Sequence, residues 1–249
     1  MNFPMPTSNK TILITGISRG LGHGIALACL DRGDTVLGLG RNTASDLASR
    51  PNFHFAQADV TNSGECTAAL ETLLRDRERL DCVILNAGVL GKIADMRDQS
   101  GETIKEVMEV NLWANKDLLD LLLRLDLPIA QIVAISSGAS VNGSRGWGGY
   151  SLSKAALNML VKLYAKERED IHFSALAPGL IDTGMQVQIR AMPDDAPFPS
   201  VAKLKQASGT DAMPDATTAG KRVLDAIDRL TGLIESGTFA DIRNPPLAD

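Results

Sequence analysis

Short apolar runs alternate along this chain with longer stretches in which apolar residues recur at helical spacing. Residues 11–14 form the first run, and its continuous apolar character is typical of a strand that other elements cover on both faces. The predicted strands are 11–14, 35–39, 53–58, 82–85, 129–135 and 171–177, with a final edge strand expected at 237–240. The helical stretches are 25–30, 62–77, 102–124, 150–168 and 219–230.

Strands that alternate with helices of about 10–20 residues predict βαβ units and therefore a parallel sheet. We expect an α/β fold in which residues 1–249 form a single domain, built on a doubly wound Rossmann-type sheet with helices on both faces. Sheets of this kind bind ligands at the carboxyl ends of their strands. Functional residues are therefore expected where a strand ends and a loop begins.

The helical periodicity fades between Gly184 and Pro214, where four prolines interrupt a polar stretch. A loop of this length is unusual inside a compact domain and often forms a lid over an active site. We therefore expect 184–214 to be a loop-rich excursion beside the substrate. A plain surface loop is the alternative.

The predicted helix over 102–124 is unusually rich in leucine. Its leucines, together with one just beyond it, are Leu112, Leu118, Leu119, Leu121, Leu122, Leu123 and Leu125. A helix that is apolar on most faces is buried on most faces. One side would pack on the sheet and the other on a neighbouring element or a second subunit. We favour a second subunit and expect a homodimer or homotetramer.

The composition excludes several functions. The chain has 249 residues, 44% of them hydrophobic, and its net charge of -5 lacks the basic footprint of a nucleic-acid-binding protein. It has no apolar run of about 18 residues and no signal-peptide pattern at its start, so a cytoplasmic protein is expected. Cys29, Cys66 and Cys82 form neither a CxxC pair nor a zinc pattern, which predicts buried thiols and no metal site.

A glycine-rich turn follows the first predicted strand directly. Gly16, Gly20 and Gly22 lie between this strand and a helix, where they permit a tight turn, close approach of a ligand and close helix packing. The free N–H groups of the helix N-terminus then favour a pyrophosphate. No Gly-Lys-Ser/Thr sequence follows, which excludes a P-loop. A dinucleotide is therefore the expected ligand.

The end of the second predicted strand indicates which dinucleotide binds. An acidic residue there would bond the ribose 2′-hydroxyl of NAD(H) and repel the 2′-phosphate of NADP(H). This strand instead leads into Arg41, and Arg19 lies in the glycine-rich turn. Two guanidinium groups hold a phosphate well through charge-assisted hydrogen bonds, so NADP(H) is favoured. Two solvated surface arginines are the alternative.

Tyr150 and Lys154 lie four residues apart at the start of a predicted helix, so they share one of its faces. A nearby ammonium favours the phenolate, which would lower the pKa of Tyr150 and make it a usable general acid or base. Taken alone, the spacing is better explained by an exposed amphipathic pair. However, Ser137 ends another predicted strand, and it is expected at the same edge of the sheet.

Several short motifs occur in the order and at the spacing of one known family. They are Thr-Gly-x-x-x-Gly-x-Gly at 15–22, Asp59-Val60, Asn86-Ala87-Gly88, Asn111, Ser137, Tyr150-x-x-x-Lys154 and Pro178-Gly179. Over nearly its whole length the chain resembles the short-chain dehydrogenases/reductases. The stretches 135–139 and 146–150 further resemble the sepiapterin reductase and benzil reductase branch.

The resemblance implies a role for each matching residue. Tyr150 would exchange a proton with the substrate oxygen, and Lys154 would lower its pKa. Ser137 would orient the carbonyl, while Asn111 would hold a water in a proton relay behind Lys154. The cofactor-binding residues that it implies are Gly16, Ser18, Arg19, Gly20, Leu21, Gly22, Arg41, Asp59, Val60, Asn86, Ala87, Gly88, Tyr150, Lys154, Pro178, Gly179, Ile181 and Thr183.

The expected function is that of an NADP(H)-dependent oxidoreductase that reduces a ketone or aldehyde to an alcohol by hydride transfer, with Tyr150 as proton donor. Two alternatives stay open: a non-catalytic NADPH-binding sensor, and an alcohol dehydrogenase working in the oxidising direction. The expected partner is a small carbonyl or alcohol substrate, not a nucleic acid or a membrane. Val89, Leu90, Trp147 and Met185 are candidates for an apolar substrate pocket.

Overall fold

Seven parallel strands form one sheet in the computed structural model, which describes residues 9–194 and 197–248. Their order across the sheet is β3-β2-β1-β4-β5-β6-β7. The strands are β1 (Thr11–Thr15), β2 (Thr35–Gly40), β3 (Phe53–Gln57), β4 (Cys82–Leu85), β5 (Gln131–Ile135), β6 (His172–Ala177) and β7 (Thr238–Asp241). All the predicted strands are confirmed, including the edge strand.

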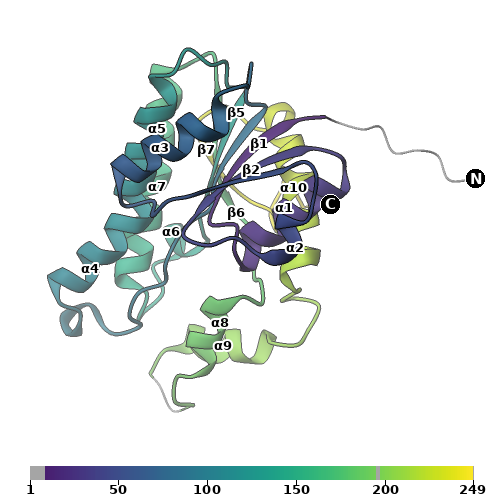
Figure 1. The fold of residues 1–249 in the computed structure, drawn as a ribbon. Coiled ribbons are helices and arrows are strands. Elements are labelled where there is room, and N and C mark those ends of the chain that lie inside the picture. Colours follow the sequence, from purple (N-terminus) through teal and green to yellow (C-terminus); the bar gives the residue numbers. More distant parts are fainter. Residues whose placement is uncertain (1–8, 195–196, 249) are drawn as a thin grey trace, which may run out of the picture.

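Helices cover both faces of this sheet (Figure 1). α1 (Gly20–Asp31) and α10 (Ala216–Leu233) pack on one face, and α3 (Ser63–Leu74), α5 (Ala114–Leu123) and α7 (Gly148–Glu167) pack on the other. Successive strand residues point to opposite faces, so each layer of helices has its own apolar core. This arrangement confirms the predicted α/β fold with a doubly wound sheet.

The order of strands reverses near the middle of the sheet. β1 lies between β2 and β4, so the chain winds toward one edge through β3 and then crosses to the other side at β4. The loops after β1 and β4 therefore leave the sheet in opposite directions, and a crevice opens at this point. The turns at Gly16 and Asn86 lie side by side at this crevice.

The predicted helix over 102–124 is confirmed, but a wide turn divides it. α4 (Gly101–Met108) passes into a π-helical turn at Glu109–Trp113 before α5 begins. Such turns are frequent at functional sites, and this one contains Asn111. Shorter helices are α2 (Ser45–Ala48), η1 (Met96–Asp98) and α6 (Ala139–Asn142). No helix in the described part of the chain combines the length and the apolarity that a bilayer crossing requires.

The leucines of α5 pack inside their own chain. Leu118, Leu119 and Leu122 are buried in the core that α5 shares with α3 and α7. Leu125, just beyond the helix, is 41% exposed. These buried leucines need no second subunit to cover them, so the expected homo-oligomer stays a prediction without support from this helix.

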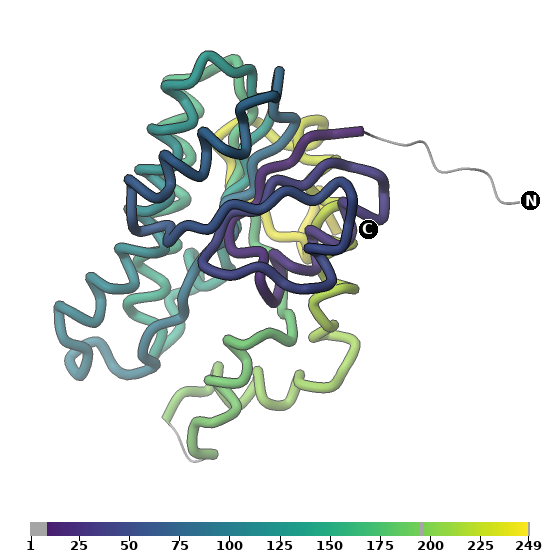
Figure 2. The backbone as a smooth tube through the Cα atoms, in the orientation of Figure 1, coloured from purple at the N-terminus to yellow at the C-terminus, as the bar shows by residue number. Residues whose placement is uncertain are grey.

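The segment 184–214 is not the loop-rich excursion that its sequence suggests. It contains two helices, α8 (Gly184–Arg190) and α9 (Pro199–Ala207). Figure 2 shows both helices projecting from the body of the molecule, on the side away from the loop between α5 and β5. The prediction of irregular structure here was therefore wrong.

Two local effects explain these helices. Pro199 occupies the first turn of α9, where its fixed φ suits a helix and its missing N–H has no partner to lose. In addition, Ile189 of α8 and Val201 of α9 are buried with Trp147 in a small separate apolar cluster. Burial of a few side chains against the rest of the fold thus stabilises α8 and α9, although their sequence lacks a regular apolar periodicity.

Two glycines allow α1 and α10 to touch through their backbones. A Cβ atom on Gly24 would lie 1.8 Å from the carbonyl oxygen of Ala216, and one on Gly220 would lie 2.2 Å from the carbonyl carbon of Gly24. Neither distance is possible for a real side chain. Glycine at both positions is therefore required for the contact between these helices.

The three cysteines are free and buried, as predicted. Burial raises the pKa of the Cys66 thiol to about 11 and that of Cys82 to about 12. It also raises the pKa of Cys29, with a contribution from the nearby carboxylate of Asp34. Thiols with such pKa values stay protonated at neutral pH, and protonated thiols are poor nucleophiles.

Candidate active site

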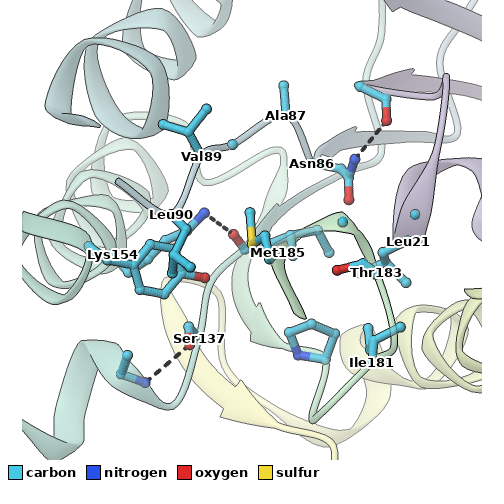
Figure 3. Close-up of a pocket in the computed structure, with 18 of the residues that line it drawn as sticks. Leu21, Asn86, Ala87, Val89, Leu90, Ser137, Lys154, Ile181, Thr183 and Met185 are labelled. Carbon is cyan, nitrogen blue, oxygen red and sulfur yellow. Dashed lines mark hydrogen bonds between the residues drawn. The ribbon is translucent and has the colours of Figure 1, made fainter. Parts of the chain in front are cut away.

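A cavity of about 1210 Å³ opens at the carboxyl ends of the strands. The loops that follow β1 to β6 line it, and residues of α7, α8 and α9 complete its wall. Figure 3 shows some of the lining residues. Most residues predicted to bind a cofactor or act in catalysis line it: Gly16, Ser18, Arg19, Gly20, Leu21, Arg41, Asp59, Val60, Asn86, Ala87, Gly88, Ser137, Tyr150, Lys154, Pro178, Gly179, Ile181 and Thr183. Gly22 and Asn111 do not line it.

The glycine-rich turn is shaped by close contacts with the turn after β4. Gly16 has a φ of +73°, and a Cβ atom there would lie 3.0 Å from the Cα of Ala87. A Cβ atom on Gly22 would lie 2.4 Å from Nδ2 of Asn86 and equally close to the carbonyl oxygen of Gly16. Gly22 therefore serves close packing behind the cavity wall rather than contact with a ligand.

Asn86 joins the two turns through hydrogen bonds. Its Nδ2 donates to the carbonyl oxygens of Thr15 (2.9 Å) and Gly16 (3.2 Å). The backbone N–H groups of Asn86 and Ala87 donate to the hydroxyl of Thr15, at 2.9 and 3.0 Å. Thr15, which the sequence interpretation left without a role, thus fixes the turn after β4 against the glycine-rich turn.

One end of the cavity suits an anionic group. α1 begins after Arg19 with no side chain capping its N-terminus and no acidic residue in its first turn. Its free N–H groups and the dipole of the helix favour negative charge at this point. Among the described residues that line the cavity, Asp59 is the sole carboxylate. The donors present therefore fit a dinucleotide pyrophosphate.

Arg19 and Arg41 lie on this same end of the cavity. Within the described chain neither guanidinium takes part in a hydrogen bond or an ion pair. Asp59 is held by Thr61, whose N–H and hydroxyl donate to its Oδ1 at 3.0 and 2.8 Å. These hydrogen bonds, with a smaller contribution from Arg41, lower the pKa of Asp59. Both arginines thus retain donors for a phosphate.

Ser137, Tyr150 and Lys154 lie together in the cavity lining. Figure 3 shows Ser137 and Lys154. Lys154 follows Tyr150 by one turn of α7, and its Nζ lies 5.9 Å from the centre of the phenol ring. Nζ donates to the carbonyl oxygen of Ile135 at 2.7 Å. Only 3% of Lys154 is exposed, and this burial lowers the pKa of its ammonium to about 8.

The expected lowering of the Tyr150 pKa is not found. Burial raises the pKa of the phenol above its usual 10, while a hydrogen bond with Ser137 acts in the opposite direction. The ammonium of Lys154 donates to the carbonyl oxygen of Ile135. The shared helix face was predicted correctly, but the predicted lowering of the phenol pKa was wrong, because burial of the phenol raises it.

Asn111 lies behind the cavity wall and is fully buried. Its Oδ1 accepts from the N–H of Val89 at 2.8 Å, and its Nδ2 donates to the carbonyl oxygen of Val89 at 2.9 Å and to Ser153 at 3.0 Å. Its own carbonyl oxygen accepts from Asn115 at 2.9 Å. Asn111 therefore fixes the loop after Gly88, and its role in a proton relay stays a prediction.

Apolar side chains form part of the wall at the substrate end of the cavity. All four candidates, Val89, Leu90, Trp147 and Met185, line it. The sequence predicted that the segment 184–214 lies beside the substrate, and residues of this segment do line the cavity, but as the helices α8 and α9 rather than as a loop. The indole N–H of Trp147 donates to the hydroxyl of Ser200 at 2.6 Å and so ties α9 to the start of α7.

Comparison with known proteins now gives the family. The family model for short chain dehydrogenases matches residues 10–194. The chain belongs to the short-chain dehydrogenase/reductase family. A structure of a short chain dehydrogenase/reductase from Saccharomyces cerevisiae superposes with a TM-score of 0.83 at 24% identity, covering 96% of this chain and 98% of the other. This similarity shows that the fold is shared.

Two curated relatives refine the placement within the family. A benzil reductase of Bacillus subtilis, which forms (S)-benzoin, is 30% identical over 93% of this chain and 97% of its own length. An NADPH-dependent pterin aldehyde reductase of Arabidopsis thaliana is 34% identical over 70% of this chain and 76% of its own. This short-chain dehydrogenase/reductase thus belongs to the benzil reductase and sepiapterin reductase-like branch, whose named relatives reduce carbonyl compounds.

Proposed function

We propose that this protein is an NADP(H)-dependent carbonyl reductase in which Tyr150 donates a proton to the carbonyl oxygen. One observation carries the proposal. A hydroxyl, a phenol and an ammonium converge at one end of a single cavity, while an uncapped helix N-terminus and two arginines lie at the other end. The cavity can thus accept a phosphorylated dinucleotide and a carbonyl compound together.

The cofactor would lie along the strand ends and supply a hydride when bound. The N-terminus of α1 would hold its pyrophosphate, and Arg19 and Arg41 would hold its 2′-phosphate. Residues of the cavity wall would contact the rest: Asp59 and Val60 the adenine, Asn86, Ala87 and Gly88 the middle, Tyr150 and Lys154 the nicotinamide ribose, and Pro178, Gly179, Ile181 and Thr183 the carboxamide end. The Arabidopsis relative, by its name, uses NADPH.

The protonation states suit reduction. A phenol whose pKa is raised by burial holds its proton at neutral pH, which an acid must do before it can donate. Lys154 keeps most of its charge at neutral pH and would stabilise the phenolate left behind. A well-placed proton donor is typically worth about 10²–10⁴ in rate.

Ser137 is arranged to donate its proton as well. The N–H of Ala139 donates to the Ser137 hydroxyl oxygen at 3.1 Å. This bond occupies a lone pair of the oxygen, and the hydroxyl proton is the part that interacts with the phenol of Tyr150. The carbonyl oxygen of a bound substrate would take the place of the phenol as acceptor, and Ser137 would orient it beside Tyr150.

The substrate would be a ketone or aldehyde with an apolar body. Leu90, Trp147 and Met185 form the wall beside Tyr150, and such a wall favours apolar groups over charged ones. We further propose that α8 and α9 cover the substrate and that residues 1–249 act as one Rossmann domain. The benzil reductase and pterin aldehyde reductase relatives, by their names, act on carbonyl compounds with aromatic or heteroaromatic bodies.

We also propose a homodimer or homotetramer, with α7 rather than α5 at the interface between subunits. Leu152, Met159 and Leu163 follow one another at helical spacing on α7, and they are 49%, 55% and 54% exposed. A row of exposed apolar side chains is typical of an interface. Light scattering in solution would measure the assembly directly.

A scan of aldehydes, ketones and diketones, followed by NADPH absorbance, tests the catalytic proposal. Tyr150→Phe removes the acid and should lower the rate by at least about a hundredfold. The chain has one other tyrosine, Tyr164, on the same helix, so Tyr164→Phe is a matched control that should stay active.

Equal rates for Tyr150→Phe and the parent would remove the proposed acid. Tight NADPH binding without turnover by either protein would favour a sensor. Turnover confined to alcohols with NADP⁺ would identify a dehydrogenase that works in the oxidising direction.

A further inference from the structure

Asn158 lies on α7 one turn beyond Lys154 and two turns beyond Tyr150, so it shares their face of the helix. It does not line the cavity. Its side-chain amide is instead bonded to two hydroxyls, one directly after β5 and one in α6. Ser136 donates to Oδ1 at 2.6 Å, and Nδ2 donates to the hydroxyl of Ser140 at 2.9 Å.

Ser140 connects Asn158 to Ser137 through further hydrogen bonds. Its hydroxyl donates to the carbonyl oxygen of Ser137 at 2.6 Å, and its backbone N–H donates to the same oxygen at 3.0 Å. Asn158 therefore holds the residue before Ser137 directly and holds Ser137 itself through Ser140. One amide fixes both sides of the turn that carries the proposed carbonyl-orienting hydroxyl.

The start of this turn is also fixed by the N–H of Ser136, which donates to the carbonyl oxygen of Leu176 at 2.8 Å, and by Lys154, which donates to that of Ile135. Beyond Ser136 the chain leads through Ser137 into α6, a helix of only four residues. Short helices gain little stability from their own hydrogen bonds. Ser136 is buried, so loss of its partner would also leave a hydroxyl without a hydrogen bond. The position of Ser137 consequently depends on contacts with α7.

We propose that Asn158 is a positioning residue for the reduction: it holds the Ser136–Ser140 turn so that the hydroxyl of Ser137 stays aimed at the substrate oxygen beside Tyr150. The proposal rests on the proposed function, because it assumes that Ser137 acts on a carbonyl. The two reacting side chains of α7 and the hydroxyl of the β5 loop then move as one unit. Small displacements of such groups cost much of the rate that alignment provides.

The first test replaces Asn158 and measures NADPH oxidation with benzil or with the carbonyl compound turned over fastest in the scan above. Asn158→Ala should lower kcat about tenfold and leave KM within about twofold, because it disturbs alignment and not the apolar wall. Lys162→Ala, one turn further along the same face and exposed, is the matched control and should match the parent.

A second variant distinguishes an effect on the position of Ser137 from an effect on folding. Asn158→Asp keeps the size of the side chain and the acceptor for Ser136, but it cannot donate to Ser140. It should fold with the thermal stability of the parent, within a few degrees, and still lose several-fold in kcat. Full parental kcat in both Asn158→Ala and Asn158→Asp would overturn the proposal.

A double-mutant cycle with Ser137→Ala gives the decisive readout. If Asn158 acts through Ser137, Asn158→Ala should slow the parent about tenfold but leave Ser137→Ala almost unchanged. An equal slowing in both backgrounds would show a general structural effect and overturn the inference. Parental rates in Ser137→Ala and Tyr150→Phe would instead refute the proposed function itself, so the two failures are distinguishable.

Discussion

At the scale of single residues, Lys154 holds a charged group inside the protein. Its Nζ donates to the carbonyl oxygen of Ile135, and only 3% of the residue is exposed. Burial lowers the pKa of the ammonium to about 8. Both the hydrogen bond and the burial depend on residues distant in the chain.

The buried ammonium of Lys154 should reduce the stability of the folded protein. A pKa that falls from 10.5 to about 8 corresponds to roughly 3 kcal/mol. Lys154→Met should therefore raise the melting temperature at pH 7 while it abolishes reduction. Because the folded pKa lies below the unfolded one, the parent gains stability as pH rises from about 8 to about 10.5, and the advantage of Lys154→Met should shrink over that range.

Thermal unfolding of both proteins at several pH values measures this difference. Lys166→Met, on an exposed residue of the same helix, serves as the control and should show no such pH dependence. A lower melting temperature for Lys154→Met at pH 7 would show that the hydrogen bond to Ile135 outweighs the cost of burying the charge.

At the scale of elements, strands were easier to predict than the segments at the substrate end. Strands buried on both faces are marked by continuous apolar runs, whatever their partners. The helices α8 and α9 depend on burial of residues such as Ile189 and Val201 against Trp147, which no local pattern reveals. The π turn around Asn111 could not be predicted either, because it changes the apolar periodicity of the sequence too little.

The contact between α1 and α10 gives a prediction at this scale. Gly24→Ala should lower the free energy of unfolding by about 1–3 kcal/mol, because its methyl group would overlap the carbonyl of Ala216 and force the helices apart. Gly232→Ala on α10 has open space around the new methyl group and should stabilise the helix by up to about 1 kcal/mol. Urea denaturation measures both changes, and equal effects of the two substitutions would contradict the role assigned to the close contact.

At the scale of the whole molecule, the cavity is lined by more cationic than anionic side chains, although the net charge of the chain is negative. The chain carries a net charge of -5, yet its cavity is lined by Arg19, Arg41, Arg145, Lys154, Lys203 and Arg243 and by one described carboxylate, Asp59. Composition alone gives only the sum of charges. Which of the charged residues meet around the cavity depends on the fold, including a strand order that could not be read from the sequence.

Arg41→Asp tests whether this local charge selects the cofactor. The preference in kcat/KM for NADPH over NADH should fall by at least about tenfold, since a charge-assisted hydrogen bond is lost and a repulsive carboxylate is added. Arg97→Asp makes the same change of charge at a side chain that is 84% exposed and outside the cavity lining, and it should leave the preference unchanged. An unchanged preference in Arg41→Asp would show that the 2′-phosphate is held elsewhere.

The protonated, buried state of the three native thiols has a practical consequence. A cysteine introduced at an exposed position of α9, for example by Gln206→Cys, would be the sole readily alkylated sulfur in the folded protein. A fluorophore attached there would report how far α9 moves from the strand ends when cofactor and carbonyl compound are added, without the need to remove any natural cysteine.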